Sequence, residues 1–136
     1  MKVVYYPDMD ETSGHNRVKE FVEKELYKLS KDQWEEMMTL IGKLQRFDSE
    51  LYAAFFREEM TKPRKYKALS NVGDGLIEYR GGTSRHGTIR LYYFVWNGAI
   101  YILGAELKKG FKTMIQRMKK IMKSYLEELK NEKKAR

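Results

Sequence analysis

The segment from residue 69 to residue 113 places the tightest limit on how this chain can fold. It holds three short runs of apolar, β-branched and aromatic residues, separated by glycine-containing turns, and this pattern is typical of antiparallel strands. Asn97 and Gly98 lie between two of the runs and predict a tight hairpin, because both residues tolerate positive φ angles. We expect a β meander with strands near residues 65–70, 75–81, 86–96 and 99–106.

The sequence before the meander predicts a strand followed by a helical hairpin. Residues 1–6, MKVVYY, form a short first strand. Apolar residues then recur at helical spacing within residues 16–29 and again within residues 34–44, where Ser30 or Asp32 can cap the second helix. The apolar stripes of both helices are expected to pack as core against the sheet.

Two further segments complete the expected fold. Residues 46–62 form either a short third helix or a loop over the core that ends before Pro63. A last helix begins near Phe111, and its basic tail is expected to fray from about residue 130. The length of 136 residues and the hydrophobic content of 42% suffice for one core. Residues 1–136 are therefore expected to form a single compact α+β domain, in which an N-terminal strand and a helical hairpin pack on an antiparallel meander with a C-terminal helix.

Composition excludes several classes of protein. The chain has no cysteine, which excludes disulfides and thiolate metal sites and fits a reducing cytoplasm. No apolar run approaches the roughly 20 residues that cross a bilayer, and acids occupy the place of a signal peptide's apolar core. We expect a soluble, cytoplasmic protein with no membrane partner, no metal site and no cofactor.

Charge is divided unevenly along the chain. Residues 1–62 hold 10 Lys or Arg and 13 Asp or Glu, whereas residues 63–136 hold 17 and 6, so the whole net charge of +8 comes from the second half. Between Arg80 and the start of the last helix there is one acid, Glu106. A sheet that projects cations and phenols with few acids is suited to a polyanion, and RNA is the polyanion that we favour. For the lysines beyond Lys119, a solvated helix face is the alternative.

Three short motifs follow one another in the second half of the chain. G-L-I-E-Y-R begins at Gly75, R-L-Y-Y-F begins at Arg90, and L-K-K-G-F-K-T begins at Leu107. Their order and spacing, together with the order of the expected elements, resemble the RelE/ParE superfamily of toxins, in particular its HigB-like, phage-Gp49-like branch. The sequence departs from that pattern at Ile77, where an aromatic residue is common, and at Met114, where proline is common.

The resemblance implies the toxin component of a type II toxin–antitoxin system. Such a toxin enters the ribosomal A site as an mRNA interferase, a metal-independent endoribonuclease that cleaves messenger RNA and inhibits translation. The implied partners are a cognate antitoxin protein, the ribosome and messenger RNA. Two alternatives stay open: a ParE-like toxin that inhibits DNA gyrase by protein binding, and a non-catalytic RNA-binding module of the same fold.

Metal-free cleavage of RNA needs a base that activates the ribose 2′-hydroxyl, cations that stabilise the phosphorane and an acid that protonates the leaving 5′-oxygen. Arg90 is the first candidate for the phosphate, because a guanidinium stays charged and can donate two hydrogen bonds. Arg80 is the second candidate. An ion pair with Glu78 is its structural alternative, because the two side chains share one face of a strand.

The remaining candidates are aromatic, or lie in turns and near the last helix. Tyr92 and Tyr93 can stack on a base or donate a proton, but they point to opposite faces, so at most one lies near the chemistry; Arg90 shares its face with Tyr92. His86 can act as acid or base, and lysines at a helix start favour phosphate. The expected catalytic residues are Arg80, Arg90, His86, Tyr93, Lys108 and Lys109. The expected RNA-binding residues are Arg85, Tyr92, Lys112 and Lys119.

Overall fold

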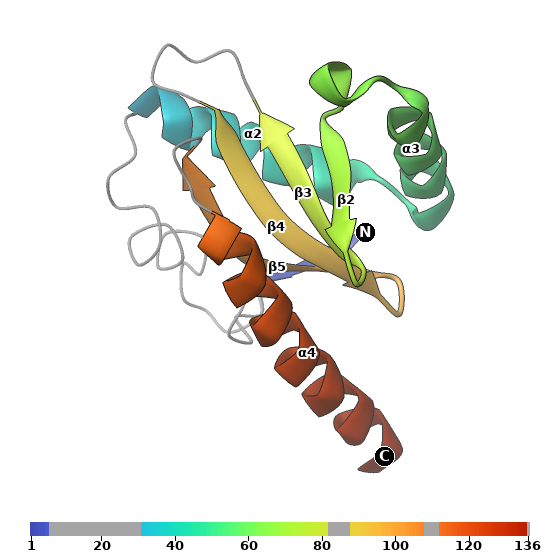
Figure 1. Cartoon of the computed structure of the whole chain (residues 1–136). Coiled ribbons are helices and arrows are strands. Elements are labelled where there is room, and N and C mark those ends of the chain that lie inside the picture. Colours follow the sequence, from blue (N-terminus) through green and yellow to red (C-terminus); the bar gives the residue numbers. More distant parts are fainter. Residues whose placement is uncertain (6–30, 82–87, 108–111, 136) are drawn as a thin grey trace.

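The structure is a computed structural model that describes residues 1–5, 31–81, 88–107 and 112–135. Its five strands are β1 (Lys2–Tyr5), β2 (Leu69–Gly73), β3 (Leu76–Gly81), β4 (Ile89–Trp96) and β5 (Ala99–Leu107). They form one mixed sheet in the order β1-β5-β4-β3-β2 (Figure 1). Strand β1 runs parallel to β5, and the other neighbours are antiparallel.

The four-stranded meander expected from the sequence is confirmed, with one correction at its start. Strand β2 begins at Leu69, not at residue 65, because Pro63 precedes a 3₁₀ turn at Arg64–Tyr66. In this turn the Tyr66 N–H donates to the Pro63 carbonyl at 2.9 Å, which keeps the chain out of the sheet. The expected hairpin at Asn97 and Gly98 is present, with φ angles of 51° and 77°.

Three helices lie within the described residues: α2 (Lys31–Arg46), α3 (Ser49–Thr61) and α4 (Lys112–Ala135). Helix α3 forms in place of the alternative loop, since the Asp48 carboxylate caps it by accepting the Leu51 N–H at 2.7 Å. Helix α4 continues past the position near residue 130 where fraying was expected. The expected helix at residues 16–29 lies outside the described residues. Within the described part of the chain, no helix is both long and apolar enough to cross a membrane.

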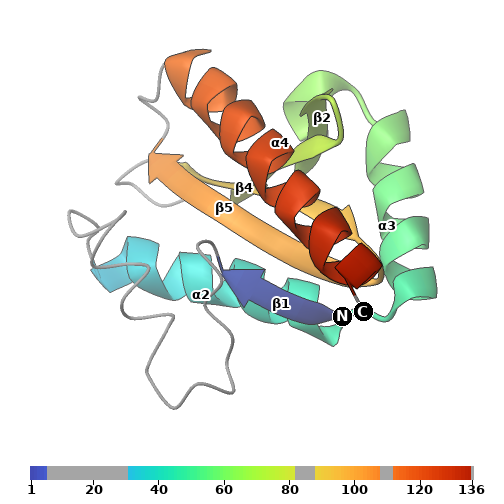
Figure 2. The same ribbon diagram turned by 90° about the horizontal axis from the view of Figure 1, so that it is seen from below.

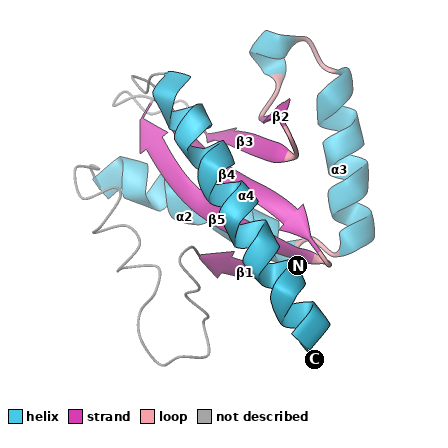
Figure 3. Cartoon of the chain, turned by 60° about the horizontal axis from the view of Figure 1, so that its bottom comes forward, coloured by secondary structure: helices cyan, strands magenta, loops and turns pink. Residues whose placement is uncertain are grey.

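The sheet has a separate core on each face. Figure 2 shows α2 on one face and α4 on the other, and Figure 3 shows α3 beside the β2 edge. Leu91 and Tyr93 point into the core under α2 and α3, whereas Tyr92 and Phe94 point into the core under α4. This alternation is the normal two-residue period of a strand. The expected α+β domain is therefore confirmed, with β4 at its centre.

Strand β5 contains one residue more than its partner requires. Tyr93 pairs with Ile102 and Tyr92 pairs with Gly104, so Leu103 is a β-bulge. Before the bulge, Ile102 points into the core under α2. After it, Ala105 does so, and Glu106 therefore lies on the opposite face of the sheet, the face of α4.

Candidate functional site

A cleft of about 650 Å³ opens on the α4 face of the sheet. Two of the expected site residues, Arg80 and Arg90, line it together. Two more cations and two carboxylates join them, so four positive groups face two negative ones. The lining residues are Met60, Arg64, Lys67, Ser70, Asn71, Val72, Glu78, Arg80, Arg90, Glu106 and Ile115.

The register of the meander places the two arginines side by side. Arg80 on β3 pairs with Arg90 on β4, and Arg90 pairs in turn with Glu106 on β5. Like charges directly opposite one another on adjacent strands repel. Carboxylates offset this repulsion: Arg80 Nε lies 3.5 Å from Glu78 Oε1, and Arg90 Nη1 lies 3.8 Å from Glu106 Oε1.

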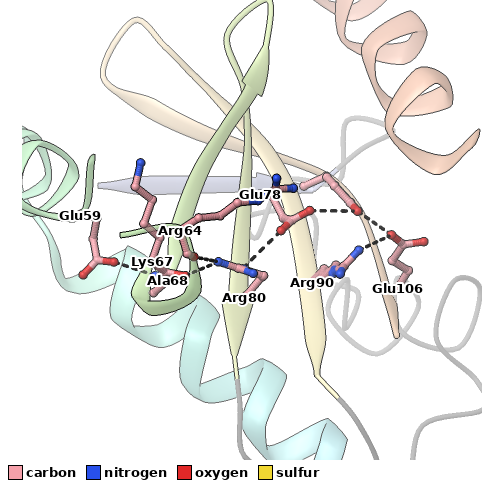
Figure 4. Close-up of polar contacts among 9 residues, drawn as sticks. Glu59, Arg64, Lys67, Ala68, Glu78, Arg80, Arg90 and Glu106 are labelled. Carbon is pink, nitrogen blue, oxygen red and sulfur yellow. Dashed lines mark hydrogen bonds and ion pairs between the residues drawn. The ribbon is translucent and has the colours of Figure 1, made fainter. Parts of the chain in front are cut away.

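Arg80 is held chiefly by backbone oxygens. Its Nη2 donates to the carbonyls of Lys67 at 2.6 Å and Arg64 at 3.0 Å, and Figure 4 shows both contacts. The ion pair with Glu78, which the sequence suggested as the structural alternative, is also present. Arg80 therefore binds the turn before β2 with the donors that a phosphate would use.

Arg90 is bound less tightly than Arg80. Its Nε, like that of Arg80, is buried and has no hydrogen-bond partner among the described residues. The ion pair of Arg90 with Glu106 is a long one, whereas Nη2 of Arg80 is already bound to two carbonyls. A buried guanidinium N–H without an acceptor is unfavourable. An anionic oxygen that enters the cleft would supply that acceptor, so Arg90 is the better placed arginine for a ligand.

Tyr92 holds Glu106 from inside the sheet. Its hydroxyl donates to Glu106 Oε1 at 2.5 Å and lies 3.5 Å from Glu78 Oε2. Burial raises the pKa of Tyr92 well above its usual value, and the hydrogen bond to Glu106 raises it further. The phenol therefore stays neutral and remains a donor. The residue is fully buried, so its ring is closed to the base stacking that the sequence suggested.

The structure does not bring Tyr93 into the cleft. Its side chain lies on the opposite face, where its hydroxyl is 2.5 Å from that of Tyr52. Lys119 lies on α4 with its amino group against Gly73, outside the cleft lining. Lys112 is the first residue of α4. The remaining expected residues, Arg85, His86, Lys108 and Lys109, lie outside the described residues.

Sequence reasoning missed Arg64 and Lys67 as cleft residues and gave no role to Glu106. Arg64 and Lys67 belong to the cationic run R-K-Y-K that directly follows Pro63. The sequence prediction placed most of this run in the first strand of the meander. Simple alternation along β5 assigns Glu106 to the α2 face, and the bulge at Leu103 reverses that assignment. The described residues include no group of three or more His, Asp or Glu placed to hold a metal ion.

In comparisons with protein-family models, curated proteins and solved structures, no match to this chain is found.

Proposed function

We propose that this protein is the toxin of a type II toxin–antitoxin system, of the RelE/ParE kind, and that it cleaves messenger RNA on the ribosome. The observation that carries the proposal is the pairing of Arg90 and Glu106 in a cation-lined cleft, with a buried guanidinium N–H left for a ligand oxygen. The proposal places the protein in the cytoplasm, where ribosomes and messenger RNA are found. Inhibition of this activity in the cell requires an antitoxin whose acidic or amphipathic segment can cover the cleft.

The cleft groups match the steps of metal-free RNA cleavage. Glu106 takes the proton of the ribose 2′-hydroxyl, whose oxygen attacks phosphorus as the bond to the 5′-oxygen breaks. Arg90 stabilises the charge that grows on the non-bridging oxygens. Tyr92 orients Glu106 through its hydroxyl. Candidates for the acid that protonates the 5′-oxygen are His86, Lys108 and Lys109, which flank β4 and β5 in the sequence.

This reaction distinguishes RNA from DNA, because the attacking group is the 2′-hydroxyl. A DNA strand of the same sequence should occupy the cleft without being cut. The same holds for an RNA whose 2′-hydroxyl at the cleavage position is methylated.

The test is cleavage of a messenger RNA by the purified protein with translating ribosomes, mapped by primer extension. Codon-linked cuts are expected. Arg90→Ala should lower the cleavage rate by a factor on the order of 10²–10³, the usual effect of losing one donor to a charged transition state. Arg57→Ala is the matched control, because Arg57 is an exposed cation of α3 and does not line the cleft. Growth arrest with intact transcripts would contradict a nuclease and favour a toxin that binds a protein such as gyrase.

A non-catalytic RNA-binding module of the same fold is the second candidate. One observation favours it: the Tyr92 hydroxyl contacts both Glu78 and Glu106, and each of these carboxylates pairs with one of the two arginines. The carboxylate that would act as the base therefore already has partners. Such a module binds RNA in a salt-dependent way but yields no cuts and no growth arrest. The primer-extension experiment separates the two candidates directly.

A further inference from the structure

The turn between α3 and β2, residues 62–68, is fixed from the helix side by a buried carboxylate. Glu59 is 3% exposed. Its Oε2 accepts the Ala68 N–H at 2.7 Å, and its Oε1 accepts a hydrogen bond from Lys62 Nζ at 2.6 Å. Both ends of the turn are thus tied to one side chain. Figure 4 shows Glu59 at one end of the row of contacts and Glu106 at the other.

The same turn is fixed from the sheet side by Arg80. The guanidinium of Arg80 binds the carbonyls of Arg64 and Lys67, and the Arg80 backbone N–H donates to the Ala68 carbonyl at 2.8 Å. The turn therefore directs its carbonyls toward Arg80. Arg64 and Lys67 are themselves among the residues that line the cleft, and within the described residues neither makes an ion pair with a carboxylate.

We infer that Arg64 and Lys67 form a second phosphate-binding subsite, which Arg80 and Glu59 hold in place as positioning residues. The cleft then binds two neighbouring phosphates of a single-stranded RNA: one at Arg90 and one at the turn. The identity of the first as the scissile phosphate depends on the proposed nuclease function, whereas the second subsite requires only that RNA occupies the cleft.

The dimensions of the cleft fit two phosphates better than one. Arg90 lies on β4 and the turn precedes β2, so their backbones are two strand spacings apart, about 10 Å. The volume of about 650 Å³ lies in the range of pockets that enclose a whole small molecule. The turn is held before any ligand arrives, so binding does not have to order it.

The subsite is tested by the salt dependence of RNA binding. The probe is a fluorescein-labelled, 2′-O-methylated oligouridylate, which cannot be cleaved, and its affinity is measured by anisotropy over a range of salt concentrations. Losing one phosphate contact flattens the slope of log affinity against log salt by about 0.7 for a single strand. This change is expected for the double variant Arg64→Ala/Lys67→Ala and, separately, for Arg90→Ala.

Lys65→Ala is the matched control for the turn. Lys65 lies in the same 3₁₀ turn but places its Nζ over the Tyr66 ring, 4.8 Å from the centroid, and does not line the cleft. The slope should stay unchanged in this variant. Arg64 is exposed and Lys67 is half-buried, and neither belongs to the core on either face of the sheet, so a folded double variant is expected for the comparison.

Glu59→Gln separates positioning from simple charge. The substitution makes the protein more positive, so electrostatics alone predicts tighter binding to RNA. Positioning predicts weaker binding and a flatter slope, because the turn loses its ion pair with Lys62. Glu58→Gln makes the same charge change at an exposed neighbour and should not flatten the slope.

These experiments distinguish failure of the second subsite from failure of the proposed nuclease function. An unchanged slope in Arg64→Ala/Lys67→Ala, with a flatter one in Arg90→Ala, would overturn the second subsite and leave the cleft as the RNA site. Slopes flattened in both variants, without cuts in the primer-extension assay, would support the subsite and contradict the nuclease. Tighter binding by Glu59→Gln would refute the positioning role.

Discussion

Two adjacent tyrosines of β4 make different contacts because they face different cores. Tyr92 donates its hydroxyl hydrogen to Glu106 in the cleft, whereas Tyr93 pairs with Tyr52 on the opposite face. Strand alternation predicted from the sequence that Arg90 and Tyr92 share a face, and the structure confirms this. The same reasoning shows why Tyr93, although it was a catalytic candidate by resemblance, does not reach the cleft.

We expect Tyr93→Phe to affect stability and leave the cleft unchanged. It leaves the buried hydroxyl of Tyr52 without its partner, which should lower the free energy of unfolding by about 1–3 kcal/mol. Urea unfolding measures this loss, and binding of the methylated RNA should match the wild-type protein. Tyr92→Phe is the counterpart, since it frees Glu106 and should slow cleavage. A Tyr93→Phe protein of normal stability that cleaves poorly would show that the assignment of faces is wrong.

Two glycines give opposite predictions. A Cβ at Gly81 would lie 2.6 Å from Cδ1 of Leu40, where α2 approaches β3. Gly81→Ala should therefore destabilise the protein by about 1–3 kcal/mol through overpacking. A Cβ at Gly42 of α2 has its nearest neighbour at 3.7 Å, so Gly42→Ala should stabilise the helix by about 0.5–1 kcal/mol. Thermal unfolding of the two variants should shift in opposite directions, and a shared direction would contradict the packing of α2 on the sheet.

At the scale of elements, the sequence predicted the helices, strands and turns that have a regular spacing of apolar residues or a clear turn signal. A clear period or turn signal marks the strands, the Asn97-Gly98 β hairpin, helix α2 and helix α4. The pairing of Arg80 with Arg90 does not follow from that period, because it depends on the register between β3 and β4. The bulge at Leu103 leaves no such signal, because either phase of β5 has apolar residues to bury. Glu106 could therefore not be placed in the cleft from the sequence.

The turn before β2 was missed for a different reason. Its conformation depends on the buried carboxylate of Glu59 and on the guanidinium of Arg80, which lies more than ten residues further along the chain. Sequence patterns report local preferences and do not report such long-range hydrogen bonds. The cations of the turn therefore looked like the exposed residues of a strand.

The Glu59 contacts should make the link between α3 and β2 sensitive to acid. Burial raises the pKa of Glu59, but hydrogen bonds from Lys62, Ala68 and Leu69 outweigh it and hold the pKa below the usual 4.5. The stabilisation is therefore complete above pH 4.5 and is lost as the pH falls through the lowered value. At neutral pH, Glu59→Gln should lower the free energy of unfolding by about 1.5–3 kcal/mol.

Urea unfolding at neutral and acidic pH checks this expectation. The difference between wild-type and Glu59→Gln proteins should narrow as the pH falls below 4.5, because Glu59 becomes neutral in both folded and unfolded chains. Glu58→Gln serves as the control and should differ little from the wild type at either pH. A difference that stays constant with pH would indicate that the charge of Glu59 does not matter.

For the molecule as a whole, buried tyrosines on both faces of the sheet predict alkaline sensitivity. Burial raises the pKa of Tyr52, Tyr92 and Tyr93, and it raises the pKa of Tyr79 to about 12. In the unfolded chain these groups titrate near 10. The folded protein holds their protons more tightly, so stability is complete below pH 10 and falls as the pH rises above it.

Phenolate absorbance and circular dichroism during an alkaline titration measure this effect together. The buried tyrosines should ionise in one step that coincides with loss of the fold, at a pH well above 10. If all ten tyrosines ionised near pH 10 while the fold persisted, the two cores would not be closed as described.

The position of α4 at the end of the chain sets the order in which the parts of the protein can fold during synthesis. The core under α4 is filled from the helix by Met118, Met122 and Tyr125, and Ile115 completes the cleft wall. All four residues follow every strand in the sequence, and nascent chains fold as they emerge. While the ribosome is making this protein, the sheet and its α2 core can form before the cleft does. The cleft, and any activity that depends on it, is therefore completed only after α4 has left the exit tunnel.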